Sequence, residues 1–224
     1  MFHDLRFRKN TVLTATFKNI SKLFGLAALA FFSFLMLRII FYYIPPQDDV
    51  AFLQLKQEYI HIDSWRIAFF IHVYTSMLVL LAGFTQFSGR LLRQQPKLHR
   101  LFGYIYIIDV LMVTGPAGML MSFYANGGIS SRIAFVLLSV LWMGSTAMAL
   151  YQVKKKNFTA HRFWMIRSYA LTLSAITLRI WKVVLANYTD IHPLDRYRII
   201  AWLGWGLNLL VAEGVIYYYR EKNS

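Results

Sequence analysis

The sequence contains no cysteine. Disulfides, thiolate metal sites, thiol redox chemistry and thioether-linked haem are therefore excluded, and any redox chemistry would have to come from a bound cofactor. Charged residues are also scarce, at 15%, whereas 58% of the residues are hydrophobic and 17% are aromatic. This composition is typical of an integral membrane protein and leaves little of the chain for a soluble domain.

Six apolar stretches are long enough to cross a bilayer as helices, which takes ~20 residues each. They lie at about 22–44, 67–87, 101–123, 133–151, 163–186 and 199–219. We therefore predict an all-α fold, an integral membrane bundle of six transmembrane helices. The first stretch is too long for a signal-peptide core, so we expect it to be retained. The predicted divisions are a basic N-terminal region at 1–21, the first helix with an external segment at 22–64, a helical membrane domain at 65–219 and a tail at 220–224.

The positive charge of the chain is placed unevenly between its loops. The net charge is +14, but the basic residues lie at helix ends, where they fix orientation, so we expect no nucleic-acid partner. Outside the spans, fifteen Lys and Arg residues fall on the side of both termini and five on the other side. The positive-inside rule therefore predicts cytoplasmic termini, and we expect a bacterial inner (plasma) membrane protein in contact with the lipid bilayer.

The first external segment, "PPQDDVAFLQLKQEYIHIDSW", has a different composition. Prolines 45 and 46 should stop the first helix, and four acidic residues follow, with His61 among them. Apolar residues recur there at helical spacing, so either a short amphipathic helix on the outer interface or a solvated loop is expected. The recurring residues are Phe52, Leu55, Tyr59 and Ile62.

Two segments at which a cytoplasmic loop leads into a helix look alike. "KLHRLFGYIY" at 97–106 and "TAHRFWMIRSY" at 159–169 both join His-Arg to an aromatic cluster, at an offset of 62 residues. Two interpretations stay open: helices two and three recur as helices four and five in the same orientation, or both segments carry Arg and aromatics because these favour the interface.

Four segments resemble a known family. They are "FIHVYTSMLVLLAGFTQF" (70–87), "LHRLFGYIY" (98–106), "AHRFWMIRSYALTLSAITLRIW" (160–181) and "WLGWGLNLLVAEGVI" (202–216). Together they resemble domain-of-unknown-function family 2306, bacterial predicted polytopic membrane proteins, over about residues 65–217. The resemblance implies a multi-pass membrane protein without an assigned reaction, so enzymatic activity is left open. The family pattern would mark His72, Gln86, His99, Arg100, His161, Arg162, Met165, Arg167, Ser168, Tyr169, Arg179, Asn208 and Glu213.

Polar residues within the spans are the candidates for a ligand-binding cavity, because charge at such depth is costly and normally faces the bundle interior. At a rise of ~1.5 Å per residue, His72 and Arg179 should share one level in the outer half of the membrane. Arg167 and Glu213 should share a level near the inner surface, where an interhelical ion pair is the simpler interpretation. The full candidate set is His72, Asp109, Arg167, Arg179, Asn208 and Glu213.

The fifth span should carry one polar or small face. His161, Ser168, Thr172, Ala175 and Arg179 fall within about 40° of one line on a helix, and such a stripe borders either a cavity or a tight helix contact. In the third span, "VTGPAG" at 113–118 places Pro116 where it should free a backbone carbonyl and kink the helix.

A b-type haem needs axial histidines from two helices at matching depth, and His99 and His161 meet this requirement. The organisation is similar to six-helix dihaem cytochrome b proteins, but the fourth helix has no histidine, with Ala134 at the position equivalent to His72. His99 and His161 could instead be interfacial groups that bind lipid phosphate or cap a loop.

Three functional classes follow from these residues. The first is binding or movement of a small molecule, an anionic lipid or a quinone in a His/Arg-lined cavity, with Asp109 and Glu213 as proton carriers. The second is a b-type haem electron carrier. The third is a membrane assembly or scaffold protein, which is favoured if all charges pair and no cavity exists.

Overall fold

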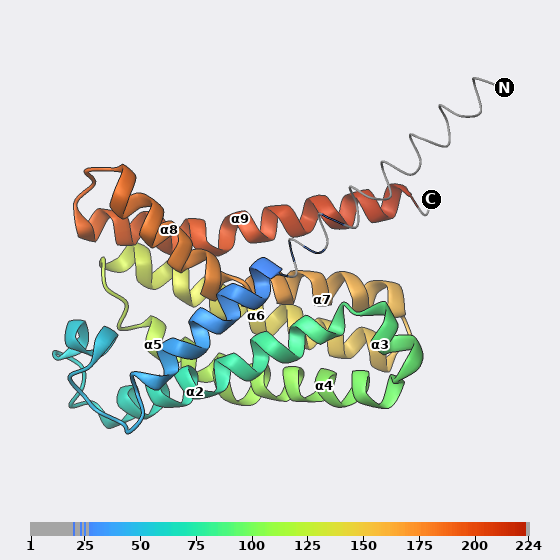
Figure 1. Ribbon diagram of the computed structural model, residues 1–224, viewed down its shortest axis with the longest axis horizontal. Coiled ribbons are helices and arrows are strands. Elements are labelled where there is room, and N and C mark those ends of the chain that lie inside the picture. Colours follow the sequence, from blue (N-terminus) through green and yellow to red (C-terminus); the bar gives the residue numbers. More distant parts are fainter. Residues whose placement is uncertain (1–19, 21–22, 24, 26, 223–224) are drawn as a thin grey trace, which may run out of the picture.

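The computed structural model describes residues 20, 23, 25 and 27–222 (Figure 1). The predicted N-terminal region at 1–21 therefore lies outside the described residues, apart from Ile20. Within the described ranges, the chain forms helices, turns and loops and no strand. The predicted all-α class is thus confirmed.

Five segments of the described chain are long and apolar enough to cross a membrane. They are α2 (Asp63–Gln86), the combined span Pro96–Ser122, α6 (Ile129–Lys154), the combined span Phe158–Tyr188 and α9 (Pro193–Glu221). Each is longer than its predicted apolar stretch, because helical hydrogen bonding continues into the polar ends. The first predicted span appears as a shorter apolar helix, Ala27–Phe41, so the count of six stays a prediction.

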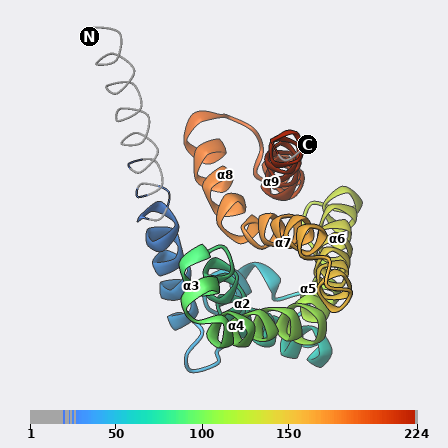
Figure 2. The same cartoon turned by 90° about the vertical axis from the view of Figure 1, so that its right-hand side faces the viewer.

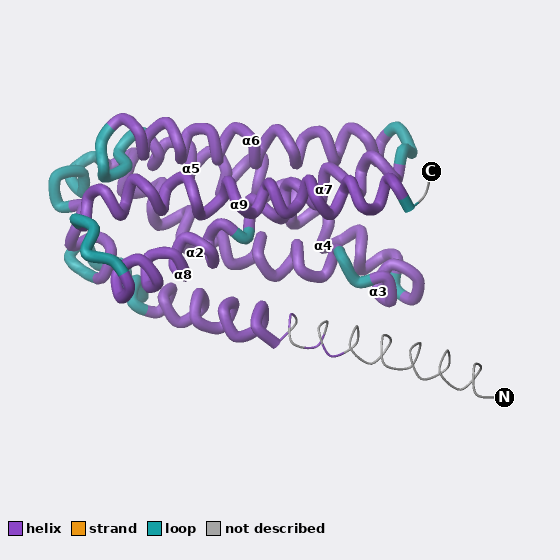
Figure 3. The backbone as a smooth tube through the Cα atoms, turned by 90° about the horizontal axis from the view of Figure 1, so that it is seen from above, coloured by secondary structure: helices purple, strands orange, loops and turns teal. Residues whose placement is uncertain are grey.

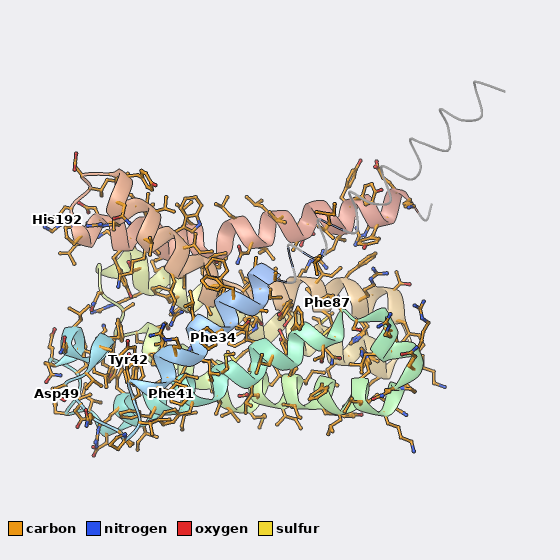
Figure 4. All side chains as sticks on the ribbon, viewed as in Figure 1. Phe34, Phe41, Tyr42, Asp49, Phe87 and His192 are labelled. Atoms are coloured by element: carbon orange, nitrogen blue, oxygen red, sulfur yellow. The ribbon has the colours of Figure 1, made fainter. Side chains whose placement is uncertain are left out.

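The bundle has two chemically different ends. One end holds α3 (Gly89–Gln94), the turn at 155–157 and the end of α9, and we call it the basic end (Figures 1 and 3). Its cationic residues are Arg90, Arg93, Lys97, Arg100, Lys154, Lys155, Lys156, Arg162, Arg220 and Lys222. The opposite end holds the 3-10 helix η1 (Ala51–Lys56) and the loops at 123–128 and 189–192. Asp49 and His192 lie at that opposite end (Figure 4).

Packing of the helices places α6 at the centre of the contacts. The combined span Pro96–Ser122 consists of α4 (Pro96–Ile108), η2 (Asp109–Val113) and α5 (Thr114–Ser122). The combined span Phe158–Tyr188 consists of α7 (Phe158–Thr172) and α8 (Ser174–Tyr188). Helix α2 packs on α4 and α5, α6 packs on α5, α7 and α9, and α9 also contacts α7 and α8 (Figure 2).

Polarity is distributed as expected for a protein surrounded by hydrocarbon. Large apolar side chains point outward along the helices, including Phe34 and Phe41 of the first helix (Figure 4). Small hydroxyl residues are buried between helices, and Thr146 and Ser168 are 0% exposed. Small residues allow close helix approach in a membrane, and their hydroxyls add interhelical hydrogen bonds.

The third predicted span is interrupted by a π-helical turn, η2. Pro116 follows this turn and has no N–H to donate, so the regular hydrogen-bond ladder cannot continue past it. The turn brings the Val110 carbonyl so close to Gly115 that a Cβ there would lie 2.1 Å from the oxygen. The disruption expected at Pro116 is therefore absorbed by a π turn, which requires glycine at position 115.

The fifth predicted span is two helices rather than one. Helix α7 ends at Thr172 and α8 begins at Ser174, and the two diverge at Leu173 (Figures 1 and 2). The last carbonyls of a helix need outside donors. Asn208 of α9 supplies one, since its Nδ2 donates to the Ala170 carbonyl at 3.0 Å and to Thr177 Oγ1 at 3.0 Å. The predicted apolar stretch at 163–186 therefore lies within one candidate membrane span that is built from two helices.

Candidate functional site

Two adjacent cavities lie toward the end opposite the basic end. The first has a volume of about 240 Å³ and the second about 320 Å³. They share seven lining residues: Phe52, His72, Ser76, Met121, Ala175, Leu178 and Arg179. We call the first the polar cavity, because Lys56, Trp65, Ser122, Ser139 and Thr172 line it and do not line the second; the rest of its wall is largely apolar, with Leu80, Phe135, Leu138 and Trp142 among the lining residues. We call the second the apolar cavity, because its remaining lining is Met36, Ile39, Ile40, Tyr43, Phe69, Val73 and Met77.

Three cationic or protonatable side chains reach the polar cavity from three separate elements. Lys56 comes from η1, His72 from α2 and Arg179 from α8. Among the described residues that line either cavity, there is no Asp or Glu. Positive groups without a lining counter-charge favour an anionic ligand, because a buried unpaired charge is costly.

His72 is oriented by the backbone of α5. Its Nδ1 lies 3.1 Å from the Thr114 carbonyl oxygen. A carbonyl oxygen only accepts, so Nδ1 carries the proton in this contact and Nε2 is the ring nitrogen left for a ligand. Gly118 lies beside the ring, where a Cβ would approach Nδ1 to 3.2 Å. The imidazole is thus held in place from the side of α5.

Asp109 lies behind His72 and does not line either cavity. Its side chain is buried at the start of the π turn, where Thr114 Oγ1 donates to Oδ1 at 2.5 Å. Thr114 Oγ1 also lies 2.5 Å from Thr75 Oγ1. Oδ2 of Asp109 has no hydrogen-bond partner in the described structure. Asp109 therefore contacts the wall that holds His72 rather than the cavity itself.

Arg179 borders both cavities. One Nη1–H donates to the Ala175 carbonyl at 2.5 Å, one turn earlier on α8. This bond turns the guanidinium back along the helix toward Ala175, which also lines both cavities. The side chain keeps accessible surface, and its guanidinium forms no salt bridge with a carboxylate among the described residues. A planar guanidinium suits a carboxylate or phosphate.

Lys56 is the charged cavity residue that the sequence did not reveal. It is 3% exposed, and its Nζ donates to the Tyr124 carbonyl and to Asn126 Oδ1, the latter at 2.6 Å. The ammonium also lies over the rings of Tyr59 and Phe52, at 5.1 and 5.8 Å from their centroids. Aromatic residues at helical spacing on both sides of one lysine were the available signal.

Burial changes the acidity of this lysine. Desolvation, with a smaller repulsion from Arg132 and an opposing attraction from Glu58, lowers the pKa of Lys56 to about 8. At neutral pH the ammonium is therefore still largely protonated, and it loses its charge in the mildly alkaline range.

The external segment differs from the predicted amphipathic helix. It forms only the short 3-10 helix η1, followed by turns. Leu53 and Lys56 are the buried residues of η1, whereas Leu55, one of the apolar residues at helical spacing, is 66% exposed. A 3-10 helix places residues i and i+3 on one side, and this pairs Leu53 with Lys56.

Trp65 adds a further donor to the polar cavity. The side chain is 1% exposed, and Nε1 has no hydrogen-bond partner in the described structure. A buried indole N–H normally finds an acceptor.

The polar stripe of the fifth span divides at the helix break. On α7, Ser168 and Thr172 belong to a buried network in which Tyr106 Oη lies 2.6 Å from Ser168 Oγ and 2.8 Å from Thr172 Oγ1. Trp142 Nε1 donates to Thr172 Oγ1 at 2.9 Å. On α8, Ala175 and Arg179 line the cavities. Thr172 also lines the polar cavity, so the stripe makes helix contacts on α7 and borders the cavities from Thr172 onward.

Arg167 and Glu213 form the predicted interhelical ion pair. Arg167 Nε and Nη2 donate to the two carboxylate oxygens at 2.5 and 2.7 Å. The guanidinium also lies 4.7 Å from the Trp164 ring centroid. Neither residue lines the two cavities, so this pair joins α7 to α9 at a separate position. Asn208 likewise lies at the α7–α8 break instead of in a cavity.

His99 and His161 lie in the half nearer the basic end and line neither cavity. His161 Nδ1 contacts the Ala149 carbonyl at 2.8 Å, which leaves Nε2 as its other ring nitrogen. His99 Nδ1 is buried without a partner in the described structure. Haem ligation by this pair stays a prediction, which an absorption spectrum of the purified protein would test.

These features define a polytopic helical membrane protein with cavities between its helices. The chain belongs to domain-of-unknown-function family 2306, described as predicted membrane protein, whose model matches residues 69–216. No curated protein and no solved structure matches the chain.

Proposed function

We propose that this protein binds an anionic ligand in the polar cavity through Lys56 and Arg179, beside His72, whose Nε2 carries no proton in the tautomer that donates from Nδ1 and can only accept from a protonated oxygen of the ligand. The proposal depends on one observation: these three side chains come from separate elements and line one cavity, while none of its described lining residues is acidic. Trp65, whose buried Nε1 has no hydrogen-bond partner in the described structure, also lines this cavity. The protein lies in the bacterial plasma membrane with its basic end in the cytoplasm, so the cavity belongs to the outer half.

The test is a calorimetric titration of the protein in phosphatidylcholine nanodiscs. The anions titrated are inorganic phosphate, ethyl phosphate and acetate. Arg179→Gln and Lys56→Gln should each weaken binding roughly 10- to 100-fold, because a hydrogen bond to a charged group contributes ~1.5–3 kcal/mol. Lys182→Gln is the matched control, since Lys182 is on α8 and lines neither cavity. Equal affinities for Arg179→Gln and Lys182→Gln would exclude the site.

The affinity should also depend on pH in a defined direction. Above about pH 8 Lys56 loses its proton, so anion binding should weaken there. Lys56→Gln should remove this alkaline loss while retaining the residual affinity given by Arg179. Uptake of labelled phosphate into liposomes would separate binding from transport.

A further inference from the structure

The second, apolar cavity shares one wall with the proposed anion site. Seven residues line both spaces, among them His72 and Arg179. The residues found only in the apolar cavity are aliphatic or aromatic, and the hydroxyl of Tyr43 already accepts from the Phe52 backbone N–H at 3.2 Å. A ligand that fills both spaces must therefore be charged at one end and apolar at the other.

The position of the apolar cavity connects it to the bilayer side of the protein. Its lining comes mainly from the first helix, from α2 and from α8. The first helix packs there through apolar contacts, with Met36 and Ile40 against Met77 and Ile176. In a membrane such contacts have no hydrophobic driving force, because lipid chains solvate the same surfaces. An alkyl chain from the bilayer can therefore replace these contacts at little cost.

Charge complementarity specifies the other end of the ligand. Arg179 stands at the shared wall, and Lys56 and Trp65 lie farther along in the polar cavity only. The acidic group of such a ligand would find hydrogen-bond donors in the polar cavity, and its alkyl chain would find apolar side chains in the apolar cavity. Inorganic phosphate would satisfy only the first half of this arrangement.

We infer that the ligand is an amphipathic lipid anion, whose acidic head lies by Arg179, Lys56 and His72 and whose alkyl chain lies in the apolar cavity against the first helix. The inference rests on the proposed anion site and specifies its ligand class.

The length of the alkyl chain provides the test. Ethyl phosphate and hexyl phosphate are each titrated calorimetrically into the protein in phosphatidylcholine nanodiscs, and the affinity is calculated from the concentration of each phosphate that is free in the water. Each methylene that leaves water for the apolar cavity should tighten binding about fourfold, so hexyl phosphate should bind on the order of a hundredfold more tightly than ethyl phosphate. Ile39→Phe fills the apolar cavity and should abolish most of this gain. Leu37→Phe is the matched control, because Leu37 is exposed on the same helix and lines neither cavity.

Three results would overturn the inference, and they are distinguishable from one another. Equal affinity for both phosphates, with loss of both in Arg179→Gln, would leave the anion site standing and reject the lipid chain. A chain-length gain that Ile39→Phe and Leu37→Phe retain alike would place the chain in bulk lipid. No binding of either phosphate would reject the anion site as well. Val73→Phe, from the α2 wall of the apolar cavity, replaces Ile39→Phe if that variant does not fold.

Discussion

Tyr106 on α4 and Ser168 on α7 share a hydrogen bond of 2.6 Å, and they stand 62 positions apart in the sequence. This separation equals the offset between the two His-Arg segments at 97–106 and 159–169. If these segments belong to a repeat, the bond joins equivalent positions, which meet where the two halves face each other. Thr146 Oγ1 also lies 2.7 Å from Ser168 Oγ, so the contact links α4, α6 and α7.

Tyr106 and Ser168 should therefore be energetically coupled. Tyr106→Phe and Ser168→Ala each remove one side of the bond and should each lower stability by about 0.5–1.5 kcal/mol, in line with net hydrogen-bond contributions. Thermal melting of the wild type, both single variants and the double variant in the same detergent gives the interaction free energy between Tyr106 and Ser168. The double variant should lose less than the sum of the single losses, and strictly additive losses would contradict a shared bond.

The Arg167–Glu213 pair makes a similar prediction with charged partners. Arg167→Gln and Glu213→Gln should each destabilise by roughly 1–2 kcal/mol, a reduced value because the Glu213 side chain is 47% exposed. The double variant should recover part of this loss. Arg167→Lys keeps the charge but loses the bidentate geometry and the stacking on Trp164, so it should fall between wild type and Arg167→Gln. Wild-type stability of either single variant would show that the pair contributes nothing.

Lys56 should give the folded protein a pH-dependent stability. Its folded pKa of about 8 lies below the ordinary value of 10.5, so between these values the folded state has lost a proton that the unfolded state keeps. The free energy of unfolding must then rise with pH across that window. Below the window, the cost of burying the charged Lys56 ammonium is fully present. Melting curves of wild type and Lys56→Met across this range isolate the effect. The stability difference between the two should change with pH only if Lys56 titrates there, and parallel curves would refute the shift.

Gly83 should not tolerate a larger residue. A Cβ at this position would lie 2.5 Å from the ring of Tyr169 and 2.8 Å from that of Tyr106. Since both rings are buried, Gly83→Ala should cost about 1–3 kcal/mol by overpacking. Gly144→Ala on α6 is the control. Apart from its chain neighbours and the backbone of its own helix, no atom lies within 4 Å of a Cβ built there, so the higher helix propensity of alanine should leave stability unchanged or raise it by ~0.5–1 kcal/mol. Equal melting temperatures for the two variants would contradict the close approach.

The orientation can be tested independently of the site. A reporter active only in the cytoplasm should give signal when fused to Ser224, and the same reporter inserted at Asn126 should not, because the basic residues should remain inside. The reverse pattern would show that the protein has the opposite orientation in the membrane, with the cavities in the inner half.

The sequence by itself determined the class of protein and the positions of most helices. Apolar length predicts spans, and the polar ends only shift the boundaries, as at α2 and α9. The Arg167–Glu213 pair was also accessible from sequence, since two costly charges at one depth on adjacent spans have few other partners. Hydropathy and helical rise are local quantities, so they can be read along the chain.

Only the tertiary structure decided which polar residues face a cavity. Asp109 and Asn208 were cavity candidates alongside Arg179 because all three are polar residues within the spans, yet Asp109 contacts the π turn and Asn208 bonds a carbonyl at the α7–α8 break. Lys56, apparently a loop cation, became a cavity residue because a 3-10 turn and the loop at 124–126 enclose it. The position of a residue along a helix gives its depth in the membrane, but not the direction in which its side chain points. That direction depends on helix rotation, helix breaks and loop folding, which are decided by contacts between segments distant in the sequence.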